Sequence, residues 1–309
     1  TSTQWPGWSK ITHIFSFGDS YTDTGFQLNR TQPNPSNPLG NPAFPGRTFS
    51  NGRNWLDFLT YSYNESQLLV YNFARGGASV DSFGNTSAPF RPFDIQLERF
   101  WQPNYAPNVT TPLNLTTPAP RWSGNEALFT MFFGINDINF SFRLPESNRT
   151  TISDSTFRTY KRLINAMYLA GARNFLFMNV PAVHRSPFIR SGGNTNAQAN
   201  VNAIQNFNNR LQAMIDEFAK SRTDVTTFLF DNFALYNDIL NDPQRRPETG
   251  VYTNTTGFCP QYSARTYNES SFIPRCGIPQ RQFFWLDSLH PTPPIHEAMA
   301  ADVAKMLRN

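Results

Sequence analysis

Charge, cysteine and long apolar runs are all scarce in this chain of 309 residues. No stretch of about 18 apolar residues occurs, which excludes a membrane-spanning helix. Charged residues make up only 16% and aromatic residues 15%, whereas intrinsic disorder needs the opposite balance. The net charge is +4 without any Lys/Arg-rich run, which argues against nucleic acid or a membrane as partner. Heptad and collagen-like repeats are absent too, so a globular core is expected.

Cysteine occurs only at Cys259 and Cys276. Neither has neighbours at the spacing of zinc ligands, so we predict no metal site. A disulfide between Cys259 and Cys276 is expected if the protein is secreted, and two free thiols if it is cytosolic.

Glycosylation sequons favour secretion. Nine Asn-x-Ser/Thr sequences occur, mostly in polar segments typical of loops, and this number indicates a secretory glycoprotein. We therefore expect a secreted, extracellular protein with N-linked glycans, and we interpret Thr1 as the start of a mature chain from which a signal peptide has been removed. Asn139 lies near the active site predicted below, where a glycan would be blocked. The sequons begin at Asn29, Asn64, Asn85, Asn108, Asn114, Asn139, Asn148, Asn254 and Asn268.

Five short apolar segments predict buried strands, because each is followed by Gly, Asn, Asp or Pro. Three longer segments have apolar residues at helical spacing and predict helices with one core face. Strands that alternate with helices predict an α/β fold, in which helices cover both faces of a parallel sheet. The strands are expected at 11–17, 68–73, 127–133, 174–180 and 225–230, and the helices over 157–167, 201–218 and 295–306.

Two irregular segments, 31–52 and 102–120, are rich in Pro, Asn and Thr. The alternation of strands and helices continues across both of them. We therefore interpret them as long surface excursions and predict a single domain that spans residues 1–309.

Three of the predicted strands are followed by residues suited to catalysis, namely Ser20, Gly77 and Asn136. The carboxyl ends of parallel strands line the ligand sites of open α/β sheets. A serine needs a base, a group that orients the base, and donors for the oxyanion. Asp287 and His290 lie three residues apart, so the carboxylate can fold back onto the imidazole. We predict Ser20 as nucleophile, His290 as base and Asp287 as orienting group.

Other catalytic motifs are missing. Residues 18–22 lack the final glycine of G-x-S-x-G, and no phosphate-binding loop or H-E-x-x-H sequence occurs. We predict that the reaction needs no metal and no organic cofactor.

Four segments in order resemble the sequence blocks of the GDSL, or SGNH, hydrolases. Each block alone is a weak signal, but together they span nearly the whole chain and each lies at the expected end of an element. Residues 46–53 (GRTFSNGR) further resemble the plant and fungal branch, and the nearest likeness is to fungal acetyl esterases of carbohydrate esterase family 16. The blocks are FSFGDSYTDTG (15–25), NFARGGA (72–78), GIND (134–137) and DSLHPT (287–292).

The resemblance implies a flavodoxin-like three-layer α/β/α sandwich, the SGNH hydrolase fold, and a serine esterase. It implies an oxyanion hole made of the backbone N–H groups of Ser20 and Gly77 and the side-chain amide of Asn136. This chain has Gly76 where the second block usually has serine. The function expected from this likeness is removal of acetyl groups from acetylated xylo-oligosaccharides or another small ester. Asp19 and Asp137 are expected to hold their loops in shape.

Two alternatives remain open at this point. A GDSL lipase or phospholipase would act on longer acyl esters. A catalytically silent glycoprotein would bind carbohydrate through its aromatic residues. Trp5, Trp8 and Tyr21 could line such a sugar-binding surface or pack in the interior.

Overall fold

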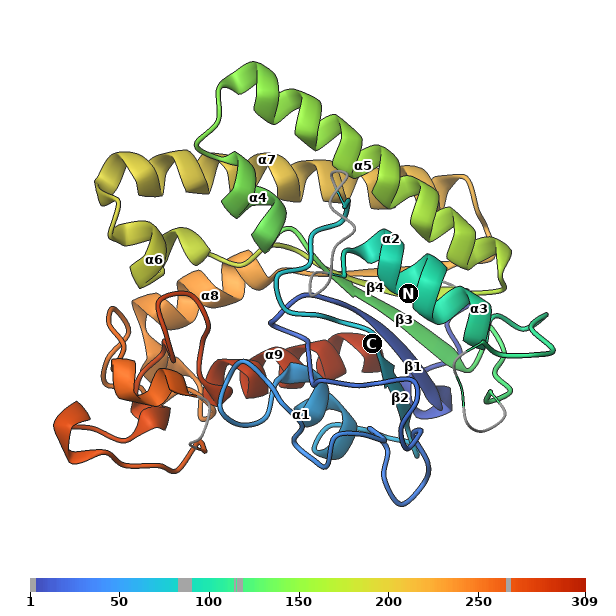
Figure 1. Cartoon of the computed structure of the whole chain (residues 1–309), viewed down its shortest axis with the longest axis horizontal. Coiled ribbons are helices and arrows are strands. Elements are labelled where there is room, and N and C mark those ends of the chain that lie inside the picture. The colour runs from blue at the N-terminus through green and yellow to red at the C-terminus, as the bar shows by residue number, and fades with distance from the viewer. Residues whose placement is uncertain (1–3, 83–90, 114, 116–118, 265–267) are drawn as a thin grey trace.

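The computed structural model describes residues 4–82, 91–113, 115, 119–264 and 268–309 (Figure 1). Within them, five parallel strands form one sheet in the order β2-β1-β3-β4-β5. This arrangement confirms the predicted parallel sheet. The strands are β1 (His13–Gly18), β2 (Leu69–Asn72), β3 (Ala127–Phe132), β4 (Asn174–Met178) and β5 (Thr226–Phe230).

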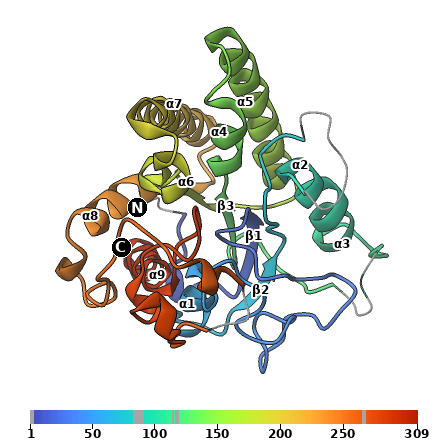
Figure 2. The same cartoon turned by 60° about the vertical axis from the view of Figure 1, so that its left-hand side comes forward.

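Two helical layers cover the sheet, which confirms the α/β/α sandwich (Figure 2). The long helices α5 (Glu146–Leu169) and α7 (Gly193–Lys220) pack on one face, together with α2 (Phe93–Ile95). The opposite face carries α1 (Trp55–Tyr61), which packs against α9 (Pro293–Arg308). Every residue of β1, β3 and β4 is buried, since each of these central strands is covered on both faces.

The order in which the strands are added to the sheet reverses between β1 and β3. The chain passes from β1 to β2 on one side and then returns to β3 on the other side of β1. Gly18 pairs with Phe132, so β1 and β3 end at the same level. The segments that follow these two strands carry Ser20 and Asn136, the latter at the start of α4 (Ile135–Ser141), and they therefore emerge next to each other at the switch point where α/β sheets bind ligands.

The segment 102–120, predicted to be irregular, begins with a helix. A π-helical turn (Gln96–Trp101) runs from α2 directly into α3 (Gln102–Tyr105). Trp101 and Tyr105 are buried against the core, and Trp122 donates its indole N–H to the Tyr105 carbonyl at 2.7 Å. Tertiary packing of these rings thus stabilises helix in a proline-rich, asparagine-rich sequence that does not favour it.

The remaining helices are short. They are α4 (Ile135–Ser141), α6 (Pro187–Arg190) and α8 (Asn232–Asn241), and the 3-10 turns Trp8–Lys10, Val183–Arg185, Pro243–Arg245, Pro260–Ala264, Pro274–Cys276 and Gln280–Gln282.

The segment of the chain between α8 and α9 forms a small second apolar cluster. It is centred on Cys259, Tyr262, Phe283 and Leu286. The disulfide expected of a secreted protein joins Cys259 to Cys276 within it, with an S–S distance of 2.08 Å. The cluster ends directly before Asp287, so it supports the loop that carries two of the predicted catalytic residues.

Candidate active site

Ser20 lies on a tight turn directly after β1. The carbonyl of Asp19 accepts hydrogen bonds from the N–H groups of Thr22 at 3.1 Å and Asp23 at 2.9 Å. This helical turn does not continue into a longer helix, because Gly25 adopts a φ of +82° and donates its N–H to Oδ1 of Asp23 at 2.7 Å. Ser20 is therefore presented on a single helical turn directly after β1.

The structure brings Ser20, His290 and Asp287 into one hydrogen-bonded chain. Nε2 of His290 lies 2.9 Å from Oγ of Ser20, and Nδ1 lies 2.9 Å from Oδ2 of Asp287. Asp287 also accepts the backbone N–H groups of Leu289 and His290, both at 2.8 Å. The carboxylate thereby fixes the loop and the imidazole at once, so Nε2 points at the serine hydroxyl.

The electrostatics of Asp287 suit an orienting carboxylate. Burial by itself would raise the pKa of Asp287, but the His290 ring and two backbone N–H groups stabilise the charged form, and the net result is a lowered pKa. Asp287 is therefore ionised at neutral pH and binds an Nδ1–H. That hydrogen bond selects the imidazole tautomer that can accept a proton at Nε2.

Gly77 and Asn136 meet at the loop after β2. Gly77 has a φ of +78°, a conformation that favours glycine. The N–H of Gly76 donates to Oδ2 of Asp23 at 2.9 Å, whereas the N–H of Gly77 has no partner within the described residues. Nδ2 of Asn136 donates to the Ala78 carbonyl at 2.9 Å and lies 3.4 Å from Oδ2 of Asp19. The side chain of Asn136 is thus anchored between the Gly77 loop and the residue before Ser20.

Two buried carboxyl groups, those of Asp19 and Asp137, bind backbone N–H groups of the segments around the site. Asp19 accepts the N–H of Tyr21 at 2.9 Å, and Asp137 accepts the N–H of Val80 at 3.0 Å. Burial raises the pKa of Asp19 to about 8 and that of Asp137 to about 7. These contacts agree with the expectation that both residues shape their loops.

Two aromatic rings contact the His290 imidazole. The centroid of the Phe49 ring lies 5.0 Å from the His290 ring, and that of Tyr21 lies 5.8 Å away. Tyr21 and Trp8 are each 1% exposed and belong to the interior, and Trp5 is half-buried and packs edge-on against Phe228. Phe49 was not singled out from the sequence, although it lies in the segment 46–53 that resembles the plant and fungal branch.

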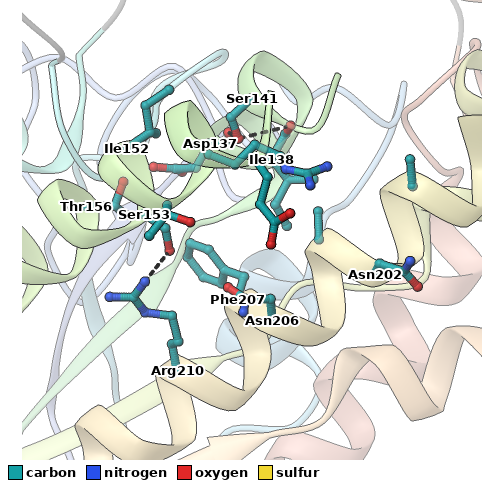
Figure 3. Close-up of a pocket in the computed structure, with 15 residues that line it drawn as sticks. Asp137, Ile138, Ser141, Ile152, Ser153, Thr156, Asn202, Asn206, Phe207 and Arg210 are labelled. Carbon is teal, nitrogen blue, oxygen red and sulfur yellow. Dashed lines mark hydrogen bonds between the residues drawn. The ribbon is translucent and has the colours of Figure 1, made fainter. Parts of the chain in front are cut away.

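A cavity of about 420 Å³ lies away from Ser20 and His290, between α4, α5 and α7 (Figure 3). Asp137, Phe207 and Arg210 are among its lining residues, and neither Ser20 nor His290 is. It is therefore a gap between helices and not the reaction site.

Neither a metal-binding cluster nor a membrane-spanning helix occurs in the part of the chain that the structure describes. No cluster of three or more His, Cys, Asp or Glu side chains there could hold a metal ion. No helix there has the length and apolar character needed to cross a membrane.

The sequon asparagines differ in exposure. Asn139 and Asn254 are half-buried, and the side-chain oxygen of Asn139 is buried. Asn85 and Asn114 lie outside the described residues. The exposed ones are Asn29, Asn64, Asn108, Asn148 and Asn268.

Comparisons with known proteins show the family to which the chain belongs. Residues 14–303 match the model of the GDSL-like lipase/acylhydrolase family. The chain is 32% identical over 241 residues to an acetylesterase of Thermothelomyces thermophilus, which covers 75% of this chain and 74% of that one. It is 25% identical over 337 residues to a phosphatidylcholine-sterol acyltransferase of Aeromonas hydrophila, with coverages of 97% and 91%.

Among solved structures, the fold resembles that of Axe2, an acetylxylan esterase from Geobacillus stearothermophilus. The TM-score is 0.50 at 14% sequence identity, and the match covers 96% of each chain. The sequence blocks, the sheet topology and the family match agree, and the chain belongs to the GDSL-like lipase/acylhydrolase family and is a carboxylic ester hydrolase.

Proposed function

We propose that this protein is a secreted serine acetylesterase that removes acetyl groups from acetylated xylo-oligosaccharides. The observation that carries the chemistry is the chain of contacts from Ser20 through His290 to Asp287, with 2.9 Å at both imidazole nitrogens. The acetyl group is supported by the acetylesterase relative at 32% identity. The carbohydrate part rests on the likeness of the sequence blocks to fungal acetyl esterases of carbohydrate esterase family 16.

The reaction follows from the positions of these groups. Oγ of Ser20 attacks the ester carbonyl while Nε2 of His290 takes the hydroxyl proton. The negative oxygen of the tetrahedral intermediate is bound by the N–H groups of Ser20 and Gly77 and by the Nδ2 hydrogen of Asn136 that does not bind the Ala78 carbonyl. His290 then protonates the sugar oxygen as its bond to the acyl carbon breaks.

Water completes the cycle. It attacks the acetyl-enzyme as His290 removes its proton, and collapse of the second intermediate releases acetate and returns the proton to Ser20. Asp287 stabilises the imidazolium that forms in both halves of the reaction. No step requires a group from outside the chain other than water and the ester.

Secretion is supported by two observations. The disulfide between Cys259 and Cys276 is typical of an oxidising compartment. Five of the sequon asparagines are exposed and accessible to a glycan. Treatment of protein from a eukaryotic secreting host with an endoglycosidase should lower its apparent mass; unchanged mass would contradict the glycoprotein assignment.

Acetate release from acetylated xylo-oligosaccharides tests the proposal. Wild type should release acetate, and Ser20→Ala should reduce the rate by several orders of magnitude while its circular dichroism stays unchanged. An organophosphonate should label wild type at Ser20. Equal rates for both proteins would show that Ser20 is not the nucleophile. Absence of labelling in folded protein would instead support the alternative that the protein is a catalytically silent glycoprotein.

Longer acyl esters are the competing substrate class. The similarity to an acyltransferase over 97% of the chain favours testing it. A series of esters from acetate to octanoate separates the two: a steep fall after acetate supports the acetylesterase, and a maximum at longer chains supports a lipase.

A further inference from the structure

Phe49 contacts both the catalytic base His290 and the loop that carries Gly77. Its ring lies against the imidazole of His290, with a centroid distance of 5.0 Å and an interplanar angle of 39°. It also lies against Gly76, where a Cβ atom would stand 2.4 Å from Cζ of Phe49. The ring therefore reaches from the base to the residue before the oxyanion donor Gly77. It also explains why this chain has glycine at position 76, because any side chain there would collide with the ring.

The ring is held in place by its neighbours. Thr48 and Ser50 are 6% and 0% exposed, and Ser50 donates its hydroxyl to the Gly52 carbonyl at 2.9 Å. Asn51 donates to Oε1 of Gln280 at 3.1 Å. Phe49 itself is only half-buried. A partly exposed ring on a pinned backbone is a preorganised contact surface, which lowers the entropic cost of binding.

The position of the ring identifies which part of an ester it faces. On Ser20, the tetrahedral carbon directs its negative oxygen toward Gly77 and Asn136, and its leaving oxygen toward Nε2 of His290. Phe49 touches the imidazole and the loop of Gly77. The ring therefore lies beside the residues that receive the leaving oxygen and the oxyanion.

We propose that Phe49 forms the binding subsite for the leaving alcohol, a flat aromatic surface on which a pyranose ring stacks. A sugar ring presents C–H groups on its faces and hydroxyls at its edge, so it pairs with an aromatic face through apolar contact and weak C–H interactions. This inference rests on the proposed function for the identity of the alcohol as a sugar. Tyr21 contacts the same imidazole but is 1% exposed and does not reach a substrate.

Phe49→Ala tests the subsite through the alcohol part of the substrate. We expect kcat/KM for acetylated xylobiose and for cyclohexyl acetate to fall about tenfold, mainly through KM, and kcat/KM for ethyl acetate to change less than about threefold. Phe49→Tyr keeps the ring and should retain activity on all three. Phe44→Ala is the matched control, because Phe44 is an exposed phenylalanine of the same segment, 45% exposed, whose ring contacts Tyr61 at 4.5 Å.

Three outcomes would overturn the subsite. An equal fall in kcat on all three esters would show that the ring only positions His290. A gain on butyrate or hexanoate esters relative to acetate would place the ring on the acyl side. Unchanged kinetics would show that the ring does not contact the substrate. If wild type hydrolyses cyclohexyl acetate but no acetylated sugar, the proposed function fails, and the ratio of cyclohexyl to ethyl acetate still decides the role of Phe49.

Discussion

Oδ2 of Asp23 accepts the backbone N–H of Gly76 at 2.9 Å. The other oxygen of the same carboxyl group accepts the N–H of Gly25 at 2.7 Å, and Arg75 lies 3.8 Å from it. One buried side chain therefore fastens the turn after Ser20 to the loop that carries Gly77. Because the Gly76 N–H is engaged, Gly77 is the glycine whose N–H can bind an oxyanion.

Replacement of Asp23 by asparagine should therefore weaken catalysis without removing any group that touches the substrate. The amide can accept only one of the two N–H groups, so the Gly77 loop loses its anchor. A hydrogen bond to a charged group contributes about 1.5–3 kcal/mol, so we expect kcat to fall roughly 10- to 100-fold with KM little changed. Steady-state kinetics on a simple acetate ester measures this. Glu65→Gln, which removes a carboxylate from an exposed pair with Arg308, should leave kcat unchanged.

Asn136→Ala should lower kcat by a larger factor. It removes a donor that is expected to bind the charge of the transition state, and the loss of one such donor costs about 2.7–4 kcal/mol, or roughly 10²–10³ in kcat. Asn209→Ala, at an exposed asparagine of α7 that belongs to no sequon, provides the control with the same change of side chain. A fall of less than threefold for Asn136→Ala would remove Asn136 from the oxyanion hole.

Asp19→Asn should change how stability depends on pH. Burial raises the pKa of Asp19 from 3.8 to about 8, so the folded state retains a proton that the unfolded chain releases. The stabilisation from this proton is complete below about pH 4 and is lost as pH rises toward 8, with a slope of at most about 1.4 kcal/mol per pH unit. Asparagine keeps the acceptor for the Tyr21 N–H and cannot ionise.

Urea unfolding of both proteins between pH 5 and 8 measures this effect. The free energy of unfolding of wild type should decrease relative to that of Asp19→Asn as pH rises. Asp137→Asn should show the same sign over a window that ends near pH 7, in accordance with its own raised pKa. A difference in free energy that stays constant with pH would show that Asp19 is ionised in the folded protein.

Loss of the disulfide should destabilise the support of the catalytic loop. The two cysteines are 17 residues apart, and a cross-link that closes a loop of about this size contributes roughly 3 kcal/mol through the unfolded chain. We expect Cys259→Ser/Cys276→Ser to lower Tm and to inactivate at a lower temperature than wild type, because Asp287 follows this segment. Thermal unfolding with and without dithiothreitol checks it: reductant should lower the Tm of wild type only.

The positions of the strands could be predicted because each is a short apolar segment between turn residues, and burial of such segments drives folding wherever they pair. The predicted ends of the strands differ from the observed ones by at most two residues. The helix over 157–167 was recognised by its apolar stripe, but α5 starts earlier, at Glu146, because its first turns have little apolar surface to reveal them. Helix α1 was missed since seven residues are too few to show a period.

For the candidate site, too, some features could be predicted from the sequence and others could not. Ser20, Gly77, Asn136, Asp287 and His290 were identified from local sequence, because each lies in a short motif whose chemistry is readable along the chain. Local sequence also predicted the pairing of Asp287 with His290, which lie three residues apart. Tertiary structure alone decided that the N–H of Gly76 is engaged by Asp23. It alone placed Phe49 on His290. These contacts join residues far apart in the chain, and their geometry depends on how the strands and loops pack, which no local pattern encodes.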